Sequence, residues 1–323
     1  MHPFVRKLIT QWRRLELPVS GETVVIAVSG GTDSVSLLLA MHDLVERGKL
    51  DLRVVAAHFD HRLRDGSGDD AEYVKRLCTK LKVELNIGHG DIKPGNVEQN
   101  ARDARYTFLT KTATNLDAFA VLTAHTQNDQ AETFLMNLVR GSGPDGLGGM
   151  KVVRELRVEK SGRGESGEEE LTDGQDAAPL LPLSSTPLLL IRPLLTWAKR
   201  RETEGYVRDM GVECCHDPMN DDTAFKRVRI RKILLPLLED MNPNIVETLA
   251  NTASLMQQLP VAATRESSDE IDLADVRDLA ERELYSRLRE WLRQKRGTTR
   301  ALQLKHIKAI ERLIQSEKSG RVA

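Results

Sequence analysis

The sequence predicts an α/β protein with a doubly wound parallel sheet and a second, smaller helical domain. Short apolar runs alternate with segments of helical apolar spacing over the first two thirds of the chain, which is typical of βαβ units. From about Asp240 the apolar spacing becomes helical throughout. Because 323 residues are enough for two domains, we expect one domain over residues 1–238 and a helical one over residues 239–323.

The predicted elements follow one another in a regular order. Strands are predicted over the β-branched or apolar runs Val24–Val28, Leu52–Ala57, Val83–Ile87, Ala118–Ala124 and Leu188–Ile191. Helices are predicted over Asp33–Glu46, around the face formed by Val74, Leu77, Cys78 and Leu81, over Val97–Asn115 and over Asp129–Arg140. In the last third of the chain, one amphipathic stripe contains Val276, Ala280, Leu284, Leu288, Trp291 and Leu292.

The segment Ser161–Ala178 interrupts this order. It contains six acidic residues, four glycines, one arginine and no aromatic residue. A segment of this composition buries too little apolar surface to offset the entropy of ordering it. We therefore predict a disordered acidic insertion near residues 160–179, in a surface loop of the first domain.

Charge and cysteine content limit the class of protein. The net charge is −1, so a nucleic-acid-binding protein of this composition would have to concentrate its basic residues locally. Three cysteines, of which Cys214 and Cys215 are adjacent, form no disulfide framework and favour a reducing compartment. We find neither a signal-peptide pattern nor an apolar run of the ~20 residues that cross a bilayer. We expect a soluble cytoplasmic protein without a membrane partner.

A polar, glycine-containing loop separates the first predicted strand from the first predicted helix. Its residues are Ser29, Gly30, Gly31, Thr32, Asp33 and Ser34. The glycines allow unusual dihedral angles and close approach, while hydroxyls, backbone N–H groups and a helix N-terminus favour an anion. The loop lacks the Gly-Lys-Ser/Thr of a Walker A motif. Asp33 would repel phosphate, so we expect it to hold Mg²⁺ or to face a cation. The alternative is a capped strand-to-helix turn without a ligand.

A second glycine-rich segment, RGSGPDGLGG, matches G-x-G-x-x-G at Gly141, Gly143 and Gly146. It follows a helical pattern instead of a strand, and Pro144 and further glycines follow where a helix should begin. We therefore do not expect it to bind a dinucleotide.

The loop Ser29–Ser34 resembles the pyrophosphate-binding loop of the N-type ATP pyrophosphatase, or PP-loop, family. The resemblance continues in chain order through AAHFDHRLR (56–64), NARDARYTFL (100–109), TAHTQNDQAETFLMNLVRGSGPDGLGGM (123–150), IRPLL (191–195), DPMNDD (217–222) and FKRVRIRKILLPLL (225–238). These segments together resemble the tRNA(Ile)-lysidine synthase family. Thr126 and Val228 stand where that family usually has a histidine and an asparagine.

The resemblance implies a Rossmann-like PP-loop fold and an ATP-dependent reaction. In that reaction, L-lysine is joined to C2 of the wobble cytidine of isoleucine tRNA with a CAU anticodon, through an adenylated cytidine, with release of AMP and pyrophosphate. ATP would bind to the six loop residues and His58, with Mg²⁺ held by Asp33. Asp33 and Arg105 would be catalytic, and Arg102, one turn before Arg105, is the alternative phosphate contact.

Two further groups of charged residues remain. Asp129 and Glu132, at i and i+3, present two carboxylates on one helix face, although this spacing is also typical of a capping box. The resemblance implies that both are catalytic and bind the substrate lysine. Five positive charges occur in seven residues, at Lys226, Arg227, Arg229, Arg231 and Lys232. We expect Arg227, Arg229 and Arg231 to bind tRNA, the alternative being a solvated basic helix face.

The expected partners are isoleucine tRNA with a CAU anticodon and free L-lysine; a monomer and a homodimer both stay open. The C-terminal helical domain is expected to bind tRNA. Two alternative functions share the loop: a PP-loop tRNA thiolase or other adenylating tRNA-modifying enzyme, and a non-catalytic ATP-binding sensor. The absence of a Cys-x-x-Cys pair from the sequence disfavours the thiolase.

Overall fold

The computed structural model describes residues 1–62, 67–90, 97–156, 187–215, 221–258, 271–277, 279–296 and 304–316. The predicted acidic insertion near residues 160–179 lies outside the described residues. The chain divides into two compact units. The first contains Met1–His125, Val152–Leu194 and Arg200–His216, and the second contains Thr126–Lys151, Leu195–Lys199 and Asp217–Ala323. The functional boundary that we expect after residue 238 stays a prediction.

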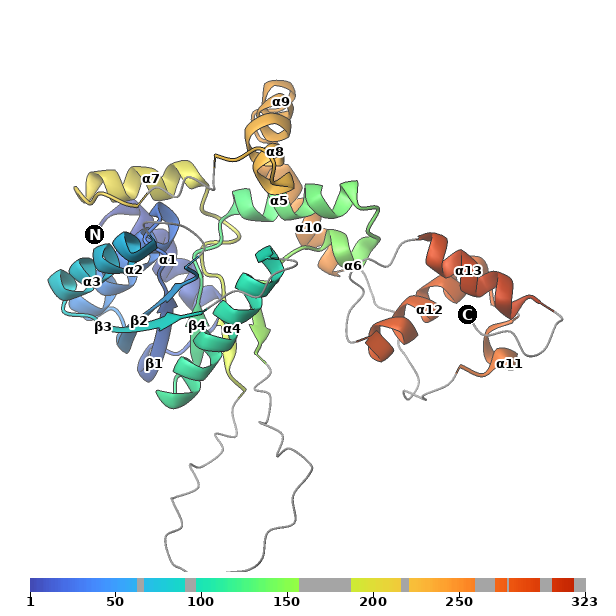
Figure 1. Ribbon diagram of the computed structural model, residues 1–323, viewed down its shortest axis with the longest axis horizontal. Coiled ribbons are helices and arrows are strands. Elements are labelled where there is room, and N and C mark those ends of the chain that lie inside the picture. Colours follow the sequence, from blue (N-terminus) through green and yellow to red (C-terminus); the bar gives the residue numbers. More distant parts are fainter. Residues whose placement is uncertain are drawn as a thin grey trace, which may run out of the picture. The chain divides into compact units, whose positions relative to one another are not determined.

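The first unit is built on a six-stranded sheet with the order β3-β2-β1-β4-β6-β5 (Figure 1). The strands are β1 (Ser20–Ala27), β2 (Asp51–Asp60), β3 (Glu84–His89), β4 (Ala120–Leu122), β5 (Val153–Glu155) and β6 (Leu189–Ile191). All neighbours run parallel except β5, which pairs antiparallel with β6. The predicted doubly wound sheet is confirmed, and its one antiparallel strand is an addition to the prediction.

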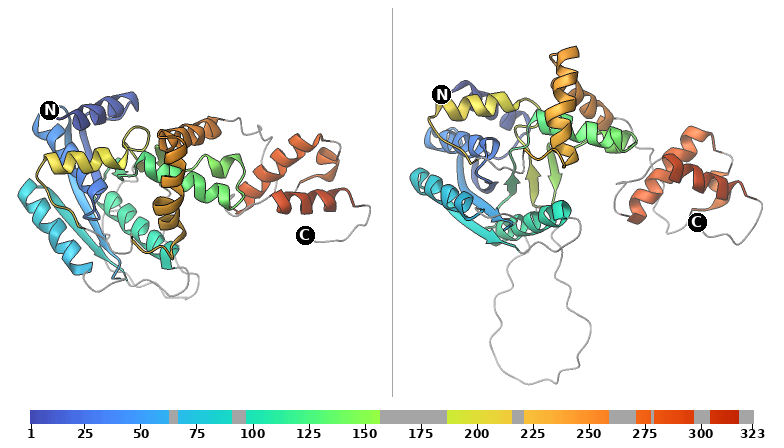
Figure 2. Two further views of the ribbon diagram at one scale, coloured as in Figure 1. Left: turned by 90° about the horizontal axis from the view of Figure 1, so that it is seen from above. Right: turned by 45° about the horizontal axis from the view of Figure 1, so that its top comes forward.

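Helices cover both faces of this sheet (Figure 2). They are α1 (Pro3–Arg14), α2 (Thr32–Glu46), α3 (Ser67–Leu81), α4 (Val97–Asn115) and α7 (Arg200–Asp209). The helices α1, α2 and α7 pack against one another, whereas α4 packs against β1, β2 and β4. Val24, Val25 and Ile26 of β1 are fully buried, as are Val121 on the neighbouring β4 and Leu190 on β6, the next strand in the sheet. Burial on both faces explains why these strands are continuous apolar runs.

The second unit is helical. It contains α5 (Gln127–Val139), α6 (Pro144–Leu147), α8 (Lys226–Arg229), a π-helical turn η2 (Ile230–Leu234), α9 (Leu235–Met241), α10 (Ile245–Gln258), α11 (Leu273–Val276), α12 (Glu281–Arg296) and α13 (Leu304–Ile314). One core joins α5, η2, α9 and α10 through Ala131, Leu135, Ile230, Leu235 and Val246. The π-helical turn ends two residues before Pro236, which has no amide hydrogen for a regular helical bond.

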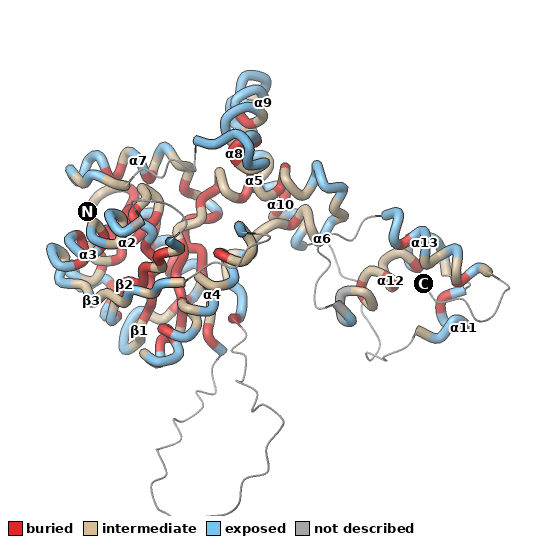
Figure 3. The backbone as a smooth tube through the Cα atoms, in the orientation of Figure 1, coloured by how far each residue is buried: buried red, intermediate tan, exposed pale blue. Residues whose placement is uncertain are grey.

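The C-terminal helices form a separate core, and they correct one prediction (Figure 3). Its buried residues are Val276, Leu284, Leu288, Ile307 and Ile314. The stripe predicted from Val276 to Leu292 is not one helix, because α11 ends at Val276 and α12 begins at Glu281. Ala280 is exposed. The apolar spacing continues across this break because both helices contribute to the same core.

Candidate functional site

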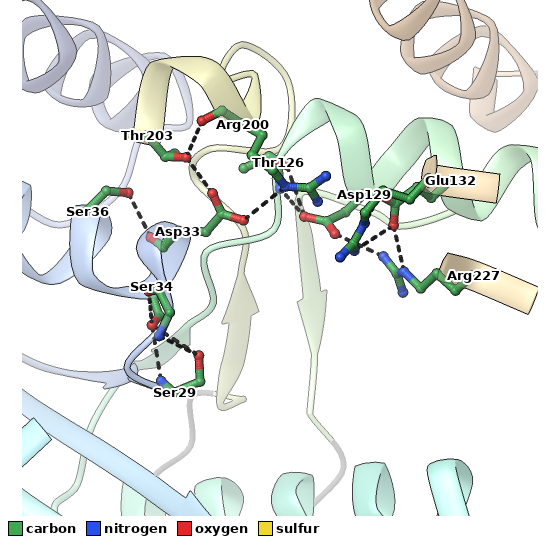
Figure 4. Close-up of polar contacts among 12 residues, drawn as sticks. Ser29, Asp33, Ser34, Ser36, Thr126, Asp129, Glu132, Arg200, Thr203 and Arg227 are labelled. Atoms are coloured by element: carbon green, nitrogen blue, oxygen red, sulfur yellow. Dashed lines mark hydrogen bonds and ion pairs between the residues drawn. The ribbon is translucent and has the colours of Figure 1, made fainter. Parts of the chain in front are cut away.

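The loop after β1 is braced by its own polar groups (Figure 4). The Ser29 amide donates to Ser34 Oγ over 3.1 Å, and the Ser34 hydroxyl donates to the Gly31 carbonyl over 2.8 Å. Gly30 has a φ of +89°, a left-handed conformation that favours glycine. Gly31 has a φ of −75°, which any residue adopts, so our expectation of unusual dihedral angles at both glycines is wrong for Gly31. Its N-cap position leaves only close approach as a reason for glycine there.

Asp33 lies in the first turn of α2 and is contacted from α7 (Figure 4). The Thr203 hydroxyl donates to Asp33 Oδ1 over 2.5 Å, and Arg200 Nε lies 4.0 Å from Oδ2. The Asp33 side chain keeps 27% of its surface exposed. The carboxylate therefore has a fixed orientation, a nearby cation and access to solvent. Neither Thr203 nor Arg200 was predicted as a site residue, because no sequence motif marks the start of α7.

His58 lies near the carboxyl end of β2, beside the strand that leads into the loop. The residue is buried, and its Nδ1 lies 2.8 Å from the Val28 carbonyl oxygen. Because a carbonyl only accepts, Nδ1 must carry the proton, which leaves Nε2 as an acceptor in the neutral ring. Among the described residues, Nε2 is buried without a hydrogen-bond partner. His58 thus combines a contact to Val28, the residue before the loop, with a buried acceptor that has no partner among the described residues.

The segment around Cys215, which no sequence motif associates with the loop, packs against it. The Cys215 amide donates to the Gly30 carbonyl over 3.0 Å, and a Cβ added to Gly30 would lie 3.1 Å from Cys215 Sγ. Tyr73 donates to the carbonyl of Glu213. Burial raises the pKa of the Cys214 thiol, which disfavours its thiolate form. Cys215 therefore packs against the loop at Gly30.

In the second unit, the predicted lysine-binding carboxylates contact two of the predicted tRNA-binding arginines (Figure 4). Arg227 donates through Nε to Glu132 Oε2 over 2.8 Å and through a terminal nitrogen to Asp129 Oδ1 over 3.0 Å. Arg231 donates through Nε to Glu132 Oε1 over 2.8 Å. The Glu132 side chain is 0% exposed. Such a buried carboxylate depends on its two cationic partners.

A capping box is present at the start of α5, but it is formed by Thr126 and Asp129, one turn before the Asp129–Glu132 pair. The Thr126 amide donates to Asp129 Oδ2 over 2.8 Å, with Thr126 as the N-cap of α5. Asp129 therefore stabilises the helix start with one oxygen and accepts from Arg227 with the other. Thr126, where the resembled family usually has histidine, has this structural role.

The basic segment presents its arginines in two directions. Arg227 and Arg231 are one turn apart and both contact Glu132, whereas Arg229 is exposed. Lys232 donates to Asp221 over 2.5 Å. The structure thus brings Arg227 and Arg231 to the carboxylates and leaves Arg229 on the surface, a division that follows from the helical period.

The glycine-rich segment after α5 is held by amide side chains. Gln130 Nε2 donates to the carbonyls of Gly148 and Met150 over 3.2 and 3.1 Å, and Gln257 Nε2 contacts the same two carbonyls. Gly149 has a φ of +64°. These contacts fix the backbone of the segment around Gly148 and Met150, and the expectation that it binds no dinucleotide stays a prediction.

The described residues contain neither a cluster of metal ligands nor a membrane span. No group of three or more His, Cys, Asp or Glu side chains in that part of the chain is arranged to hold a metal ion. None of its helices combines the length and the apolar character needed to cross a bilayer.

Comparison with known proteins places this geometry in a family. The model of the PP-loop domain matches residues 5–238. Similar proteins include the tRNA(Ile)-lysidine synthases of Salinispora tropica (32% identity over 93% of this chain and 84% of the relative), Geobacter sulfurreducens (33%; 94% and 61%) and Thermotoga maritima (30%; 82% and 55%). The chain spans about half the length of several of the relatives it matches.

A solved structure agrees in fold. The U34-tRNA thiolase NcsA of Methanococcus maripaludis superposes with a TM-score of 0.59 at 13% identity, over 80% of this chain and 81% of that chain. By its loop, its sheet and its similarity to these relatives, the chain belongs to the PP-loop family and, within it, to the tRNA(Ile)-lysidine synthase family.

Proposed function

We propose that the protein ligates L-lysine to C2 of the wobble cytidine in isoleucine tRNA with a CAU anticodon. The observation that carries this proposal is the position of Asp33, a solvent-accessible carboxylate in the first turn of α2, directly after a loop braced by its own hydrogen bonds. Membership of the tRNA(Ile)-lysidine synthase family supports the substrate class. Isoleucine tRNA, free lysine and ATP are the proposed substrates.

The first proposed step is adenylation. The C2 oxygen of the cytidine attacks the α-phosphorus of ATP, and pyrophosphate leaves. The N-terminus of α2 and the loop from Ser29 to Ser34 provide amide and hydroxyl donors for phosphate oxygens. His58 Nε2 is available to accept from a hydroxyl or amine of the nucleotide. Arg105 is proposed to contact a phosphate, in keeping with its place in the first half of α4.

Mg²⁺ fits this step. The ion is usually held by one or two carboxylates together with substrate phosphates, and the single accessible carboxylate of Asp33 meets that requirement. Bound there, Mg²⁺ would neutralise part of the negative charge on ATP. The hydrogen bond from Thr203 orients the Asp33 carboxylate for this role.

The second proposed step is displacement of AMP by lysine. The ε-amine nitrogen bonds to C2, the bond from C2 to the adenylate oxygen breaks, and AMP leaves with that oxygen. At pH 7 only roughly one lysine side chain in two thousand is neutral, so a carboxylate must accept a proton as attack proceeds. Asp129 and Glu132 are the proposed carboxylates.

The arginine contacts add a condition to this step. Arg227 and Arg231 occupy both carboxylates in the structure, so lysine and the guanidinium groups compete for the same oxygens. Phosphates of bound tRNA would attract the guanidinium groups and free carboxylate oxygens for the ammonium group. We therefore propose that tRNA binds before lysine.

Incubation with radiolabelled lysine, ATP and bulk bacterial tRNA tests the function. We expect ATP-dependent label in tRNA, and label in the isolated isoleucine tRNA after oligonucleotide capture. Sulfur incorporation without lysine incorporation would instead support the thiolase, and ATP binding without modification of tRNA would support the sensor. Cytoplasmic location, a homodimer and tRNA binding by residues 239–323 stay predictions.

A further inference from the structure

Arginine side chains from separate elements surround the ring of Tyr106 in the first unit. This Tyr106 arginine cluster consists of Tyr106, Arg102 and Arg105 on α4, Arg154 on β5 and Arg192 directly after β6. The guanidinium carbons of Arg102, Arg105 and Arg154 lie 5.0, 5.4 and 5.5 Å from the ring centroid. All three distances are within the ~6 Å range of cation–π contacts. Arginines from different elements of the fold thus lie close to a single phenol ring.

The charges in this cluster affect one another. Arg192 is buried, and burial lowers its pKa, as do the charges of Arg154 and Arg102. Burial on its own would raise the pKa of Tyr106, but Arg102, Arg105 and Arg192 bring that pKa below its ordinary value. The lowered pKa of Tyr106 agrees with a local excess of positive charge, whereas burial is the main cause of the lowered pKa of Arg192. Like charges this close repel one another, and a bound anion would relieve the repulsion.

The cluster lies at the functional edge of the sheet. Arg192 follows the carboxyl end of β6, and α4 connects β3 to β4, so its first half lies towards that same edge. The strands β1 and β6 flank β4, so their ends are ~10 Å apart at the usual strand spacing. The loop Ser29–Ser34 leaves the carboxyl end of β1. Ligands of such sheets bind at this edge.

We propose that Tyr106, Arg154 and Arg192 extend the phosphate contact proposed above for Arg105, so that the Tyr106 arginine cluster as a whole binds a phosphate group. Guanidinium groups match phosphate oxygens with paired donors, and the phenol hydroxyl adds another donor. The proposed reaction has two sources of this chemistry, the tRNA backbone and the pyrophosphate part of ATP. The identity of these sources rests on the proposed function, whereas binding of phosphate can be measured without the reaction.

Arg154→Gln is the principal test variant. Arg154 is exposed on a short edge strand, so its replacement removes one charge of the cluster without removing a buried group. Tyr106→Phe keeps the ring and removes the hydroxyl. Arg208→Gln is the matched control, because Arg208 is an exposed arginine of α7 in the same unit. Binding of tRNA over a salt series and of inorganic pyrophosphate by calorimetry would be measured for the full chain, with melting curves.

If the phosphate belongs to tRNA, Arg154→Gln should weaken tRNA binding about tenfold at low salt and reduce the salt slope by about one. If it belongs to ATP, the same variant should weaken pyrophosphate binding about tenfold and leave tRNA binding unchanged. We expect a smaller effect of Tyr106→Phe in the same assay and none of Arg208→Gln. Unchanged binding of both ligands by a folded Arg154→Gln protein would overturn the proposal. Phosphate binding that depends on Arg154, in a protein that transfers no lysine, would contradict only the proposed function.

Discussion

At the scale of single residues, Asp33 and Glu132 are carboxylates in opposite situations. Asp33 has one hydroxyl donor, a guanidinium nitrogen at 4.0 Å and partial exposure, so a ligand can reach it. Glu132 is fully buried and shared by two arginines. Removing one partner of a buried ion pair usually costs about 3–5 kcal/mol. Replacement of the two carboxylates should therefore have different consequences.

Asp33→Asn should fold normally and lose lysine transfer, because the amide is nearly isosteric but cannot hold Mg²⁺ as a carboxylate does. Thr203→Val is the control, since it removes the hydroxyl donor and keeps the charge of Asp33. We expect the control to lose only several-fold in rate. Activity above about a tenth of wild type in Asp33→Asn, a loss below ~1.4 kcal/mol, would show that Asp33 serves neither ATP nor lysine.

Asp129→Asn and Glu132→Gln separate lysine binding from structural support. Loss of the Asp129 charge should raise the KM for lysine roughly ten- to a hundredfold, while pyrophosphate release in a single turnover without lysine persists. Glu132→Gln should in addition lower the melting temperature by several degrees, because Arg231 and Arg227 both lose the charge of Glu132, while Arg227 keeps its contact to Asp129.

Pyrophosphate release, lysine incorporation and melting curves would be measured side by side on both variants. Loss of both half-reactions in Asp129→Asn together with lower stability would point to the capping bond with Thr126 as the main role. Loss of adenylation alone, with an intact fold, would assign Asp129 to the nucleotide.

At the scale of elements, only one of the two glycines in the turn from β1 to α2 has a backbone conformation that favours glycine. Gly30 is left-handed and packs against Cys215, whereas Gly31 has ordinary dihedral angles and its nearest neighbour to an added Cβ is Ser29 Oγ at 3.6 Å. The two adjacent glycines are therefore favoured at their positions for different structural reasons.

Gly30→Ala should destabilise the protein by about 1–2 kcal/mol and impair ATP-dependent pyrophosphate release, because alanine disfavours the left-handed region and its Cβ would crowd Cys215. Gly31→Ala should stay within ~0.5 kcal/mol of wild type. Its KM for ATP should rise, since the added methyl group would meet a phosphate that approaches the N-cap. Equal melting temperatures for the two variants would contradict this division.

Apolar periodicity predicts the buried strands and helices well because their side chains face a core. The helix over Val97–Asn115 is confirmed at both ends. The pattern did not predict β5, whose residues Arg154 and Glu155 are exposed. It also could not predict that Arg227 contacts Glu132, because ion pairs between residues far apart in the chain leave no periodic signal. The loop Ser29–Ser34 and the carboxylates of Asp129 and Glu132 could be identified from residue type, whereas the residues that contact them depend on the tertiary structure.

The acidic insertion is a testable element in its own right. Deletion of Gly164–Asp176 should leave lysine transfer and the melting temperature nearly unchanged, because an acidic, glycine-rich loop makes few buried contacts. Activity assays and calorimetry on the shortened protein check this. A large drop in melting temperature would show that the segment packs against the rest of the protein.

At the scale of the whole molecule, binding to a polyanion has to arise from local charge, because the net charge is only −1. The helix α13 has such a local charge. Lys305, Lys308 and Arg312 are exposed at positions i, i+3 and i+7, while Ile307 and Ile314 are buried. The helical period thus places a basic face opposite the apolar one.

Replacing Lys305, Lys308 and Arg312 together by glutamine should weaken tRNA binding and leave the fold intact, since all three side chains are exposed. The slope of log K against log salt should fall by ~0.7–0.9 for each phosphate that the variant no longer binds. Adenylation at saturating tRNA should persist, because none of these residues is assigned to ATP. The control replaces three exposed cations of the first unit, Lys49, Lys80 and Arg208. Equal reductions of the slope in both triple variants would attribute the effect to net charge and contradict a specific tRNA surface on α13; an unchanged slope in the α13 variant would exclude this face from tRNA binding.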